Sequence, residues 1–225
     1  GDNNYGRLGD GTTTSRSTPT PVVGLTGATA IAAGATHSCV VKQDATVACW
    51  GDNNKGQLGD GTTTNRLTPT PVVGLTGVTA VTADTSYSCA LKQNGIVACW
   101  GYNGDGQLGD GTTTNRLTPT PVVGLTGATA VTAGDLHSCA VKQNGATDCW
   151  GDNLGGELGD GTTTARLTPT PVVGLTGVTD LTAGTFYSCA VQKNSTAYCW
   201  GTNSDGQLGD GSIIGRVTPT PVIRL

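Results

Sequence analysis

The chain has 225 residues, of which 36 are glycine and 10 are proline, and it carries a net charge of −4 with 12% charged residues. The low charge argues against disorder, and the modest hydrophobic share of 36% favours several small cores over one large core. The 12 basic residues form no stripe, which argues against a nucleic-acid partner, and no apolar run approaches the roughly 20 residues of a membrane-spanning helix.

The sequence is built from repeats with a period of fifty residues and no insertions. A glycine-rich loop unit, typified by residues 51–75, alternates with a strand unit, typified by residues 76–100. We therefore expect a single repeat array over residues 1–225, with a half-repeat at 1–25 and full repeats at 26–75, 76–125, 126–175 and 176–225. Because loop units stand at both ends, we expect the chain to be a section of a longer array.

Within the loop unit, residues 51–61 are rich in Gly, Asp and Asn, which is typical of tight turns. The Thr-Pro-Thr-Pro-Val-Val segment at 68–73 follows. Proline cannot donate a hydrogen bond to a neighbouring strand, so this segment predicts an edge strand rather than a central one.

The strand unit predicts three further short strands. Residues 78–83 alternate small and β-branched side chains, which suits a strand packed in a crowded centre. Two apolar runs, 87–93 and 96–100, flank Asn94 and Gly95 and predict a hairpin. Four short strands in about fifty residues indicate an all-β fold of propeller type built from antiparallel four-stranded blades. The alternative is an open β-repeat superhelix or solenoid.

The hairpin register, with Gly95 in the left-handed conformation, places Cys89 directly opposite Cys99. Their Cβ atoms are then about 4.5–5.5 Å apart, close to the spacing of a disulfide. On the loop-entropy model each ring stabilises the fold by about 3 kcal/mol. Free buried thiols and a metal site remain the alternatives, although a metal usually needs four ligands at shorter spacings. The predicted pairs are Cys39 and Cys49, Cys89 and Cys99, Cys139 and Cys149, and Cys189 and Cys199.

The recurring motifs resemble the regulator of chromosome condensation repeat over the whole chain. The segments Trp50-Gly51-Asp52-Asn53, 56–61 (Gly-Gln-Leu-Gly-Asp-Gly) and 133–138 (Ala-Gly-Asp-Leu-His-Ser) carry the resemblance. It implies a β-propeller, commonly of seven four-stranded blades. Members include a nucleotide exchange factor for a small GTPase and many interaction platforms. The cysteine pairs resemble the extracellular bacterial branch. Exchange activity rests on non-repeated features that have no equivalent here, so it is not carried over.

Few residues suggest catalysis. The two histidines, His37 and His137, exchange with Tyr87 and Tyr187 at the equivalent places, and a general base does not exchange with tyrosine in this way. Asn194 lies in an Asn-x-Ser/Thr sequon at a hairpin turn and is a candidate for N-glycosylation. We predict no enzyme, no cofactor and no metal.

An Asp and an Arg recur six residues apart in every loop unit. They form either a binding patch repeated from loop to loop or a clamp that holds each loop, and the clamp is favoured. The pairs are Asp10 and Arg16, Asp60 and Arg66, Asp110 and Arg116, Asp160 and Arg166, and Asp210 and Arg216.

In repeats this similar, no site differs from its equivalents, whereas an enzyme needs one asymmetric arrangement of catalytic residues. Four cystines imply an oxidising compartment. We therefore expect a secreted or cell-surface protein, of bacterial origin, that acts as a structural or adhesive element of a surface appendage or filament. Its partners are then copies of itself or other extracellular proteins. The alternatives are a multivalent protein- or glycan-binding propeller and, less favoured, a GTPase exchange regulator.

Overall fold

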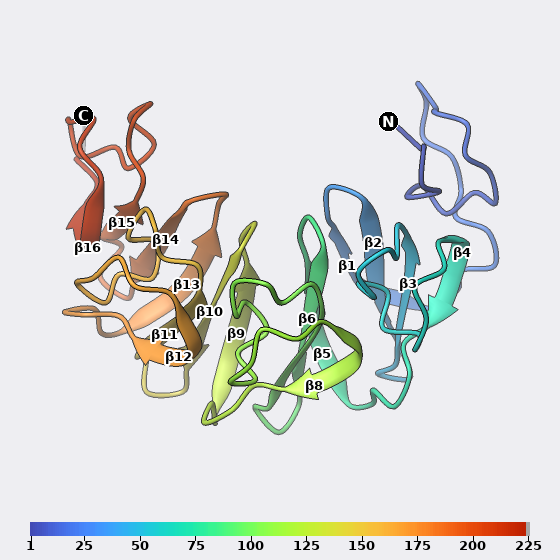
Figure 1. The fold of residues 1–225 in the computed structure, drawn as a ribbon, viewed down its shortest axis with the longest axis horizontal. Coiled ribbons are helices and arrows are strands. Elements are labelled where there is room, and N and C mark those ends of the chain that lie inside the picture. Colours follow the sequence, from blue (N-terminus) through green and yellow to red (C-terminus); the bar gives the residue numbers. More distant parts are fainter. Residues whose placement is uncertain (224–225) are drawn as a thin grey trace. The chain divides into compact units, whose positions relative to one another are not determined.

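The computed structural model describes residues 1–223, and over this range the fold is all-β. Sixteen strands form four antiparallel sheets of four strands each, and every sheet uses four strands that are consecutive in the chain (Figure 1). Each sheet falls within one of the predicted full repeats. The fold class is therefore the predicted one, a set of four-stranded blades of propeller type.

The blades are numbered in chain order. Blade 1 contains β1 (Ala28–Ala33), β2 (His37–Lys42), β3 (Val47–Gly51) and β4 (Arg66–Pro71). Blade 2 contains β5 (Val78–Ala83), β6 (Tyr87–Lys92), β7 (Val97–Gly101) and β8 (Arg116–Pro121). Blade 3 contains β9 (Ala128–Ala133), β10 (His137–Lys142), β11 (Thr147–Gly151) and β12 (Arg166–Pro171). Blade 4 contains β13 (Val178–Ala183), β14 (Tyr187–Gln192), β15 (Ala197–Gly201) and β16 (Arg216–Pro221).

The hairpin between β6 and β7 has the predicted register, with Cys89 opposite Cys99. The backbone N–H of Lys92 donates to the carbonyl of Ile96, and Gly95 has a φ of 76°, as the three-residue turn requires. The Thr-Pro-Thr-Pro segment is also where it was expected, because β4, β8, β12 and β16 are each the last strand of their sheet.

By compactness the chain divides into two units. The first comprises residues 1–103 and 114–121 and holds blades 1 and 2; the second comprises residues 104–113 and those from 122 onward and holds blades 3 and 4. In the first unit, Cys39, Val41 and Val47 of blade 1 share one core with Val78 and Trp100 of blade 2. The same packing recurs between blades 3 and 4 in the second unit. The single array over residues 1–225 remains a prediction.

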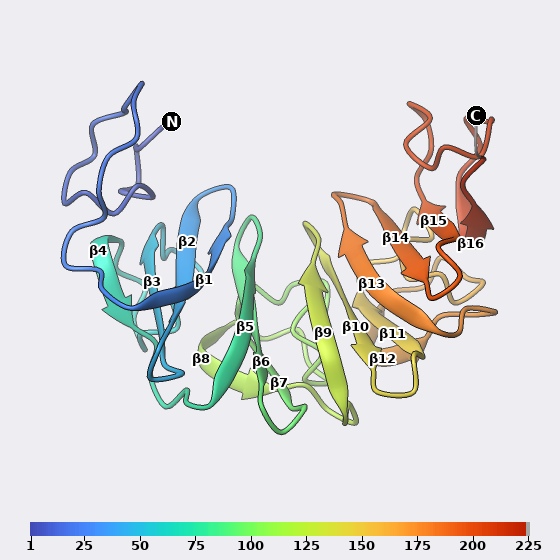
Figure 2. The same ribbon diagram turned by 180° about the vertical axis from the view of Figure 1, so that it is seen from behind.

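The half-repeat at residues 1–25 contains no strand (Figure 1 and Figure 2). Its Val22 and Leu25 pack against Val40, Ala48 and Trp50 of blade 1. A loop unit therefore docks on the blade that follows it in the chain, even when it is not attached to a strand of its own sheet.

Candidate functional site

The recurring feature of the structure is the junction at which a loop unit meets the following blade. The carbonyl oxygen of Gln57 accepts the indole N–H of Trp100 at 2.9 Å and the hydroxyl of Ser88 at 2.9 Å. Arg7, Gln107 and Glu157 do the same for the tryptophan and serine of the next blade. The four tryptophans are 0–1% exposed, so they are core residues and do not form an exposed aromatic surface.

A glycine makes this close approach feasible. Gly59 has a φ of +67°, and a Cβ atom there would lie 2.7 Å from the indole nitrogen of Trp100. Both the left-handed backbone and the contact exclude larger residues. The recurring Gly in Leu-Gly-Asp-Gly is thus needed for packing of the loop against the tryptophan.

The histidines are structural links between blades. His37 Nε2 lies 2.8 Å from the Ser88 hydroxyl, and that hydroxyl already donates to the Gln57 carbonyl. His37 therefore donates from Nε2 to Ser88. Complete burial lowers the pKa of His37 to about 4, and His137, which contacts Ser188 at 2.9 Å, behaves alike. Neither histidine opens onto a cleft where it would meet a substrate.

The Asp and Arg of the loop unit contact each other. The ion-pair distances are 2.7–2.8 Å for Asp10 and Arg16, Asp60 and Arg66, Asp160 and Arg166, and Asp210 and Arg216. The aspartate side chains are only 3–4% exposed, whereas the arginines are 36–37% exposed. Asp110 holds its own turn through the N–H and hydroxyl of Thr112, and Arg116 begins β8. This geometry agrees with a clamp; a ligand-binding role for these residues remains a prediction.

Hydrogen bonds to the clamped aspartates explain their acidity. In the first loop unit, the hydrogen bond from the Thr12 hydroxyl, together with that from Arg16, lowers the pKa of Asp10 to about 2 against the opposing effect of burial. In the second, burial acts to raise the pKa of Asp60, but hydrogen bonds from Thr62 and Arg66 hold it below its ordinary value. Each clamp is therefore charged at neutral pH.

Sequence reasoning missed the residue at the centre of each loop. Asn53 donates from Nδ2 to Asp60 and to the carbonyls of Thr62 and Thr64, and its Oδ1 accepts the N–H of Leu58. It is fully buried. The available signal was its presence at the third position of all five loop units, a position that turn propensity alone also explains.

All four predicted cysteine pairs form disulfides, each between the second and third strands of a blade. Their Cα atoms are 4.0–4.1 Å apart. The four disulfides favour an oxidising environment. The described segments contain no helix with the length and apolarity that a membrane crossing requires. Within the same range, no three His, Cys, Asp or Glu side chains gather as a metal ion requires.

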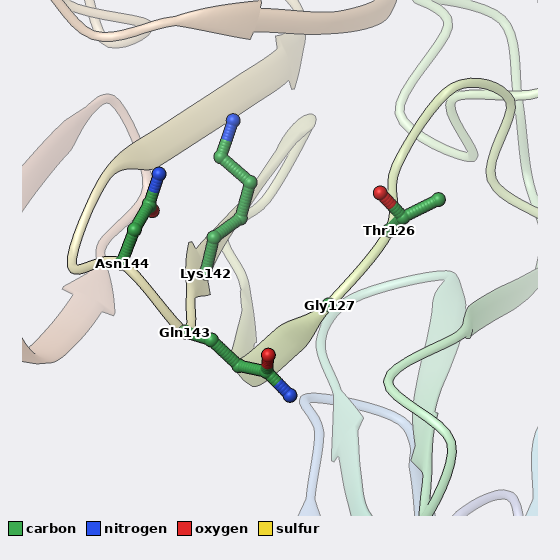
Figure 3. A pocket seen from close by; sticks show the side chains of 5 residues that line it. All are labelled: Thr126, Gly127, Lys142, Gln143 and Asn144. Atoms are coloured by element: carbon green, nitrogen blue, oxygen red, sulfur yellow. The ribbon is translucent and has the colours of Figure 1, made fainter.

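Shallow polar pockets lie beside the hairpin tips. One, of about 340 Å³, is lined by Thr126, Gly127, Lys142, Gln143 and Asn144 (Figure 3). Its counterpart in blade 1, of about 320 Å³, is lined by the equivalent residues, with Asp44 in place of Asn144. Asn194, the sequon residue, occupies the same turn in blade 4, where it is exposed and its Oδ1 accepts the N–H of Thr196. Its glycosylation remains a prediction.

The loop units also expose one apolar side chain at a fixed position. In the Val-Val pair that ends the Thr-Pro-Thr-Pro-Val-Val segment, Val72 is buried, but Val73 is 51% exposed. We call the equivalent residues the exposed valines; their exposed fractions are 51–53%, and they are Val23, Val73, Val123 and Val173.

The blades, junctions and loop clamps together define a propeller of repeated blades. One family model of the regulator of chromosome condensation (RCC1) repeat matches residues 1–41, 44–91, 94–141 and 149–191. A second model of the same repeat matches four segments between residues 28 and 207. The chain belongs to the RCC1 repeat family. The resemblance inferred from the sequence motifs is confirmed.

Solved structures show the same fold. Human WBSCR16 is 21% identical with a TM-score of 0.87, and the match covers 99% of this chain and 61% of that one. Prp20p of Saccharomyces cerevisiae is 23% identical with a TM-score of 0.82, covering 92% and 53%. The receptor kinase CR4 ectodomain of Physcomitrella patens is 29% identical with a TM-score of 0.54, covering 82% and 44%. The chain thus spans about half the length of these proteins. No curated protein sequence matches it.

Proposed function

We propose that this chain is a non-enzymatic, multivalent scaffold that binds proteins, including copies of itself, outside the cell as a structural or adhesive element. The observation that carries the proposal is the uniformity of what the loop units expose. In each of the first four loop units the same valine is about half exposed and the clamped aspartate is buried, while the tryptophans and most cystines of the blades are buried as well. A surface of identical small apolar contacts suits binding through several weak sites at once.

The contacts of the buried histidines and aspartates also support a non-enzymatic role. Each histidine is hydrogen-bonded to a serine of the next blade, and each clamped aspartate is buried within its own loop. A catalytic site needs an asymmetric set of groups that reaches substrate, whereas these groups hold the loops and blades together.

The structures with the same fold support protein binding and an extracellular setting in general terms, without naming a partner for this chain. The structure of Prp20p was described with its binding to Gsp1p and histones, and the CR4 chain is a receptor kinase ectodomain. The four disulfides make an oxidising compartment the natural setting for this chain. We further propose secretion or surface display by a bacterium, and we do not carry over GTPase exchange.

The test is to purify the chain without reductant, measure its mass by light scattering over a range of concentrations and image it by cryo-electron microscopy. We expect filaments or higher assemblies that dissociate on dilution. A stable monomer that also binds no extracellular protein would overturn the proposal.

A second candidate is glycan binding, which the matching hairpin-tip pockets of blades 1 and 3 favour. Both pockets are polar, carry a lysine and an amide, and are open to solvent, as pockets for sugar hydroxyls often are. A glycan array is the direct test, and binding with more than one site per chain is the expected result. An array without binding would exclude this candidate.

A further inference from the structure

The second and seventh positions of the loop unit lie side by side, and their chemistry differs between repeats. In the first loop unit, Asp2 and Arg7 form an ion pair at 2.6 Å. In the second, Gln57 donates from Nε2 to Asp52 at 3.0 Å. The fourth unit places two acids here, Asp152 and Glu157, which are 7% and 1% exposed.

The backbone around this pair keeps the arrangement of the other loop units. The N–H of Gly155 donates to Glu157 Oε2 at 2.8 Å, as the N–H of Lys55 donates to Gln57 Oε1 at 2.9 Å. The remaining oxygen of Glu157 therefore stands where the amide nitrogen of Gln57 stands, facing an aspartate. Two ionised carboxylates would repel each other in this buried position, whereas a protonated Glu157 can donate to Asp152 as the amide does.

The other charged group that interacts with the pair carries the same sign. Asp105 interacts with Asp152, and after burial the charges of Asp152 and Asp135 raise the pKa of Asp105. Burial, followed by the charge of Asp152, raises the pKa of Glu157 to about 7. Glu157 therefore keeps its proton at pH values well above the ordinary pKa of a glutamate and releases it near neutral pH.

Glu157 also carries the junction with blade 4. Its carbonyl accepts the indole N–H of Trp200 at 2.8 Å and the hydroxyl of Ser188 at 3.0 Å. Trp200 is fully buried in the core that this loop shares with blade 4. A shift of the loop at Glu157 thus moves the carbonyl oxygen that accepts the hydrogen bonds from Trp200 and Ser188 of blade 4.

We propose that Asp152 and Glu157 share one proton in the folded protein and form a pH-sensitive lock, which holds residues 151–158 in the conformation that seats blade 4. Loss of that proton leaves two facing carboxylates, and their repulsion opens the loop. The junction of blade 4 then loosens as the pH rises above neutral, while the junction of blade 2, built on Asp52 and Gln57, does not respond.

Glu157 is the only glutamate in the chain, which makes its protonation directly observable. Protein labelled with ¹³C-glutamate gives one side-chain carboxyl resonance by NMR. We expect its titration midpoint near pH 7, and a midpoint at least one unit lower in D152N. A midpoint at the ordinary glutamate value near 4.5 in the parent chain would overturn the proposal.

Stability measurements test the lock itself. Because the folded state retains a proton that the unfolded state releases, stability conferred by Glu157 is lost as the pH rises from about 4.5 to 7. The ratio of unfolding constants of the parent and E157Q should therefore rise at least tenfold between pH 5 and pH 8.5. Hydrogen exchange should increase over residues 184–201 of the parent chain and remain unchanged there in E157Q. Equal pH dependence in the two chains, or a change that spares blade 4, would refute the lock.

The repeats provide matched controls. Q57E builds the same two-acid pair with Asp52 and should introduce the alkaline loss of stability at blade 2. Q107E places a glutamate in the loop unit whose second position is Tyr102 instead of an aspartate, so it lacks the partner carboxylate of the pair and should respond less. If Q57E and Q107E respond equally, burial alone is responsible and the shared proton is refuted.

Discussion

At the scale of single residues, the chain uses titratable groups as internal supports. The neutral imidazole of His37 donates to Ser88, which in turn donates to the carbonyl of Gln57. In blade 2 the place of the histidine is taken by Tyr87, which is equally buried. The site thus needs an aromatic ring with a polar tip, and no proton transfer is involved.

This exchange leads to a prediction for acid stability. The histidine pKa is about 4 in the folded chain and 6.5 when unfolded, so the unfolded state takes up protons first as the pH falls. The stability that neutral His37 and His137 confer is complete above pH 6.5 and is lost by pH 4, at about 2–3 kcal/mol each. We expect H37Y/H137Y to abolish this loss in urea titrations at pH 7 and pH 4.5.

The histidine experiment is best done in the E157Q background, because Glu157 titrates in an overlapping range with the opposite sign. The tyrosine variant should fold, since Tyr87 occupies the same position in blade 2. If the parent and tyrosine chains lose stability equally between pH 7 and pH 4.5, the buried histidines are not the cause.

The loop clamp gives a second prediction at this scale. Asp60 accepts hydrogen bonds from the N–H and hydroxyl of Thr62, from Asn53 and from Arg66. D60A leaves buried donors without an acceptor, so we expect a loss of about 1–3 kcal/mol in the free energy of unfolding. D44N is the control, because Asp44 lies in an exposed turn whose equivalents in blades 2 and 3 are asparagines. Equal effects of the two substitutions would contradict the clamp.

At the scale of the element, the hairpin between the second and third strands of each blade is closed by its disulfide. The cystine joins directly opposed residues, such as Cys89 and Cys99 in β6 and β7. Each ring spans ten residues, which corresponds to about 3 kcal/mol on the loop-entropy model. We expect C89A/C99A to lower the free energy of unfolding by about 2–3 kcal/mol, measured by denaturant titration without reductant.

The pairing can be verified before stability is measured. A lysine stands between the two cysteines of every pair, at positions 42, 92, 142 and 193. Tryptic digestion of the denatured, unreduced chain should therefore release four peptide pairs that separate only after reduction. Peptides that alkylate without prior reduction would instead indicate free thiols.

Much of this element was predictable from the sequence. Asn94 and Gly95 determine the turn, the turn determines the register, and the register places Cys89 opposite Cys99. The junctions were not predictable in the same way. The indole of Trp100 reaches a backbone carbonyl 43 residues earlier, and a backbone acceptor carries no sequence signature. The sequence alone also does not show that Asp152 and Glu157 face each other; the hydrogen bond between the equivalent Gln57 and Asp52 in the structure does.

At the scale of the whole molecule, the number of equivalent contacts decides how strongly the chain can bind. The exposed valines lie at the same position in four loop units, so each contributes a similar, weak contact to a partner. Weak contacts on one chain reinforce one another, because after the first has formed the others bind at a high effective concentration. Affinity should therefore fall in steps as valines are removed, whereas a single dominant site would give one large drop.

The corresponding prediction is that V73D lowers self-association and that V73D/V173D lowers it further, by about tenfold or more, without a change in thermal stability. Both valines are 51% exposed, so an aspartate there disturbs contacts with a partner and leaves the core intact. Sedimentation velocity of the unreduced proteins gives the association constants.

N94D/N194D is the matched control, because it adds the same charge at turns where blade 1 itself has Asp44. It should associate like the parent chain. If it weakens association as much as V73D/V173D does, net charge is responsible rather than the exposed valines. If neither double variant weakens association, the exposed valines are not the contacts through which the chains associate.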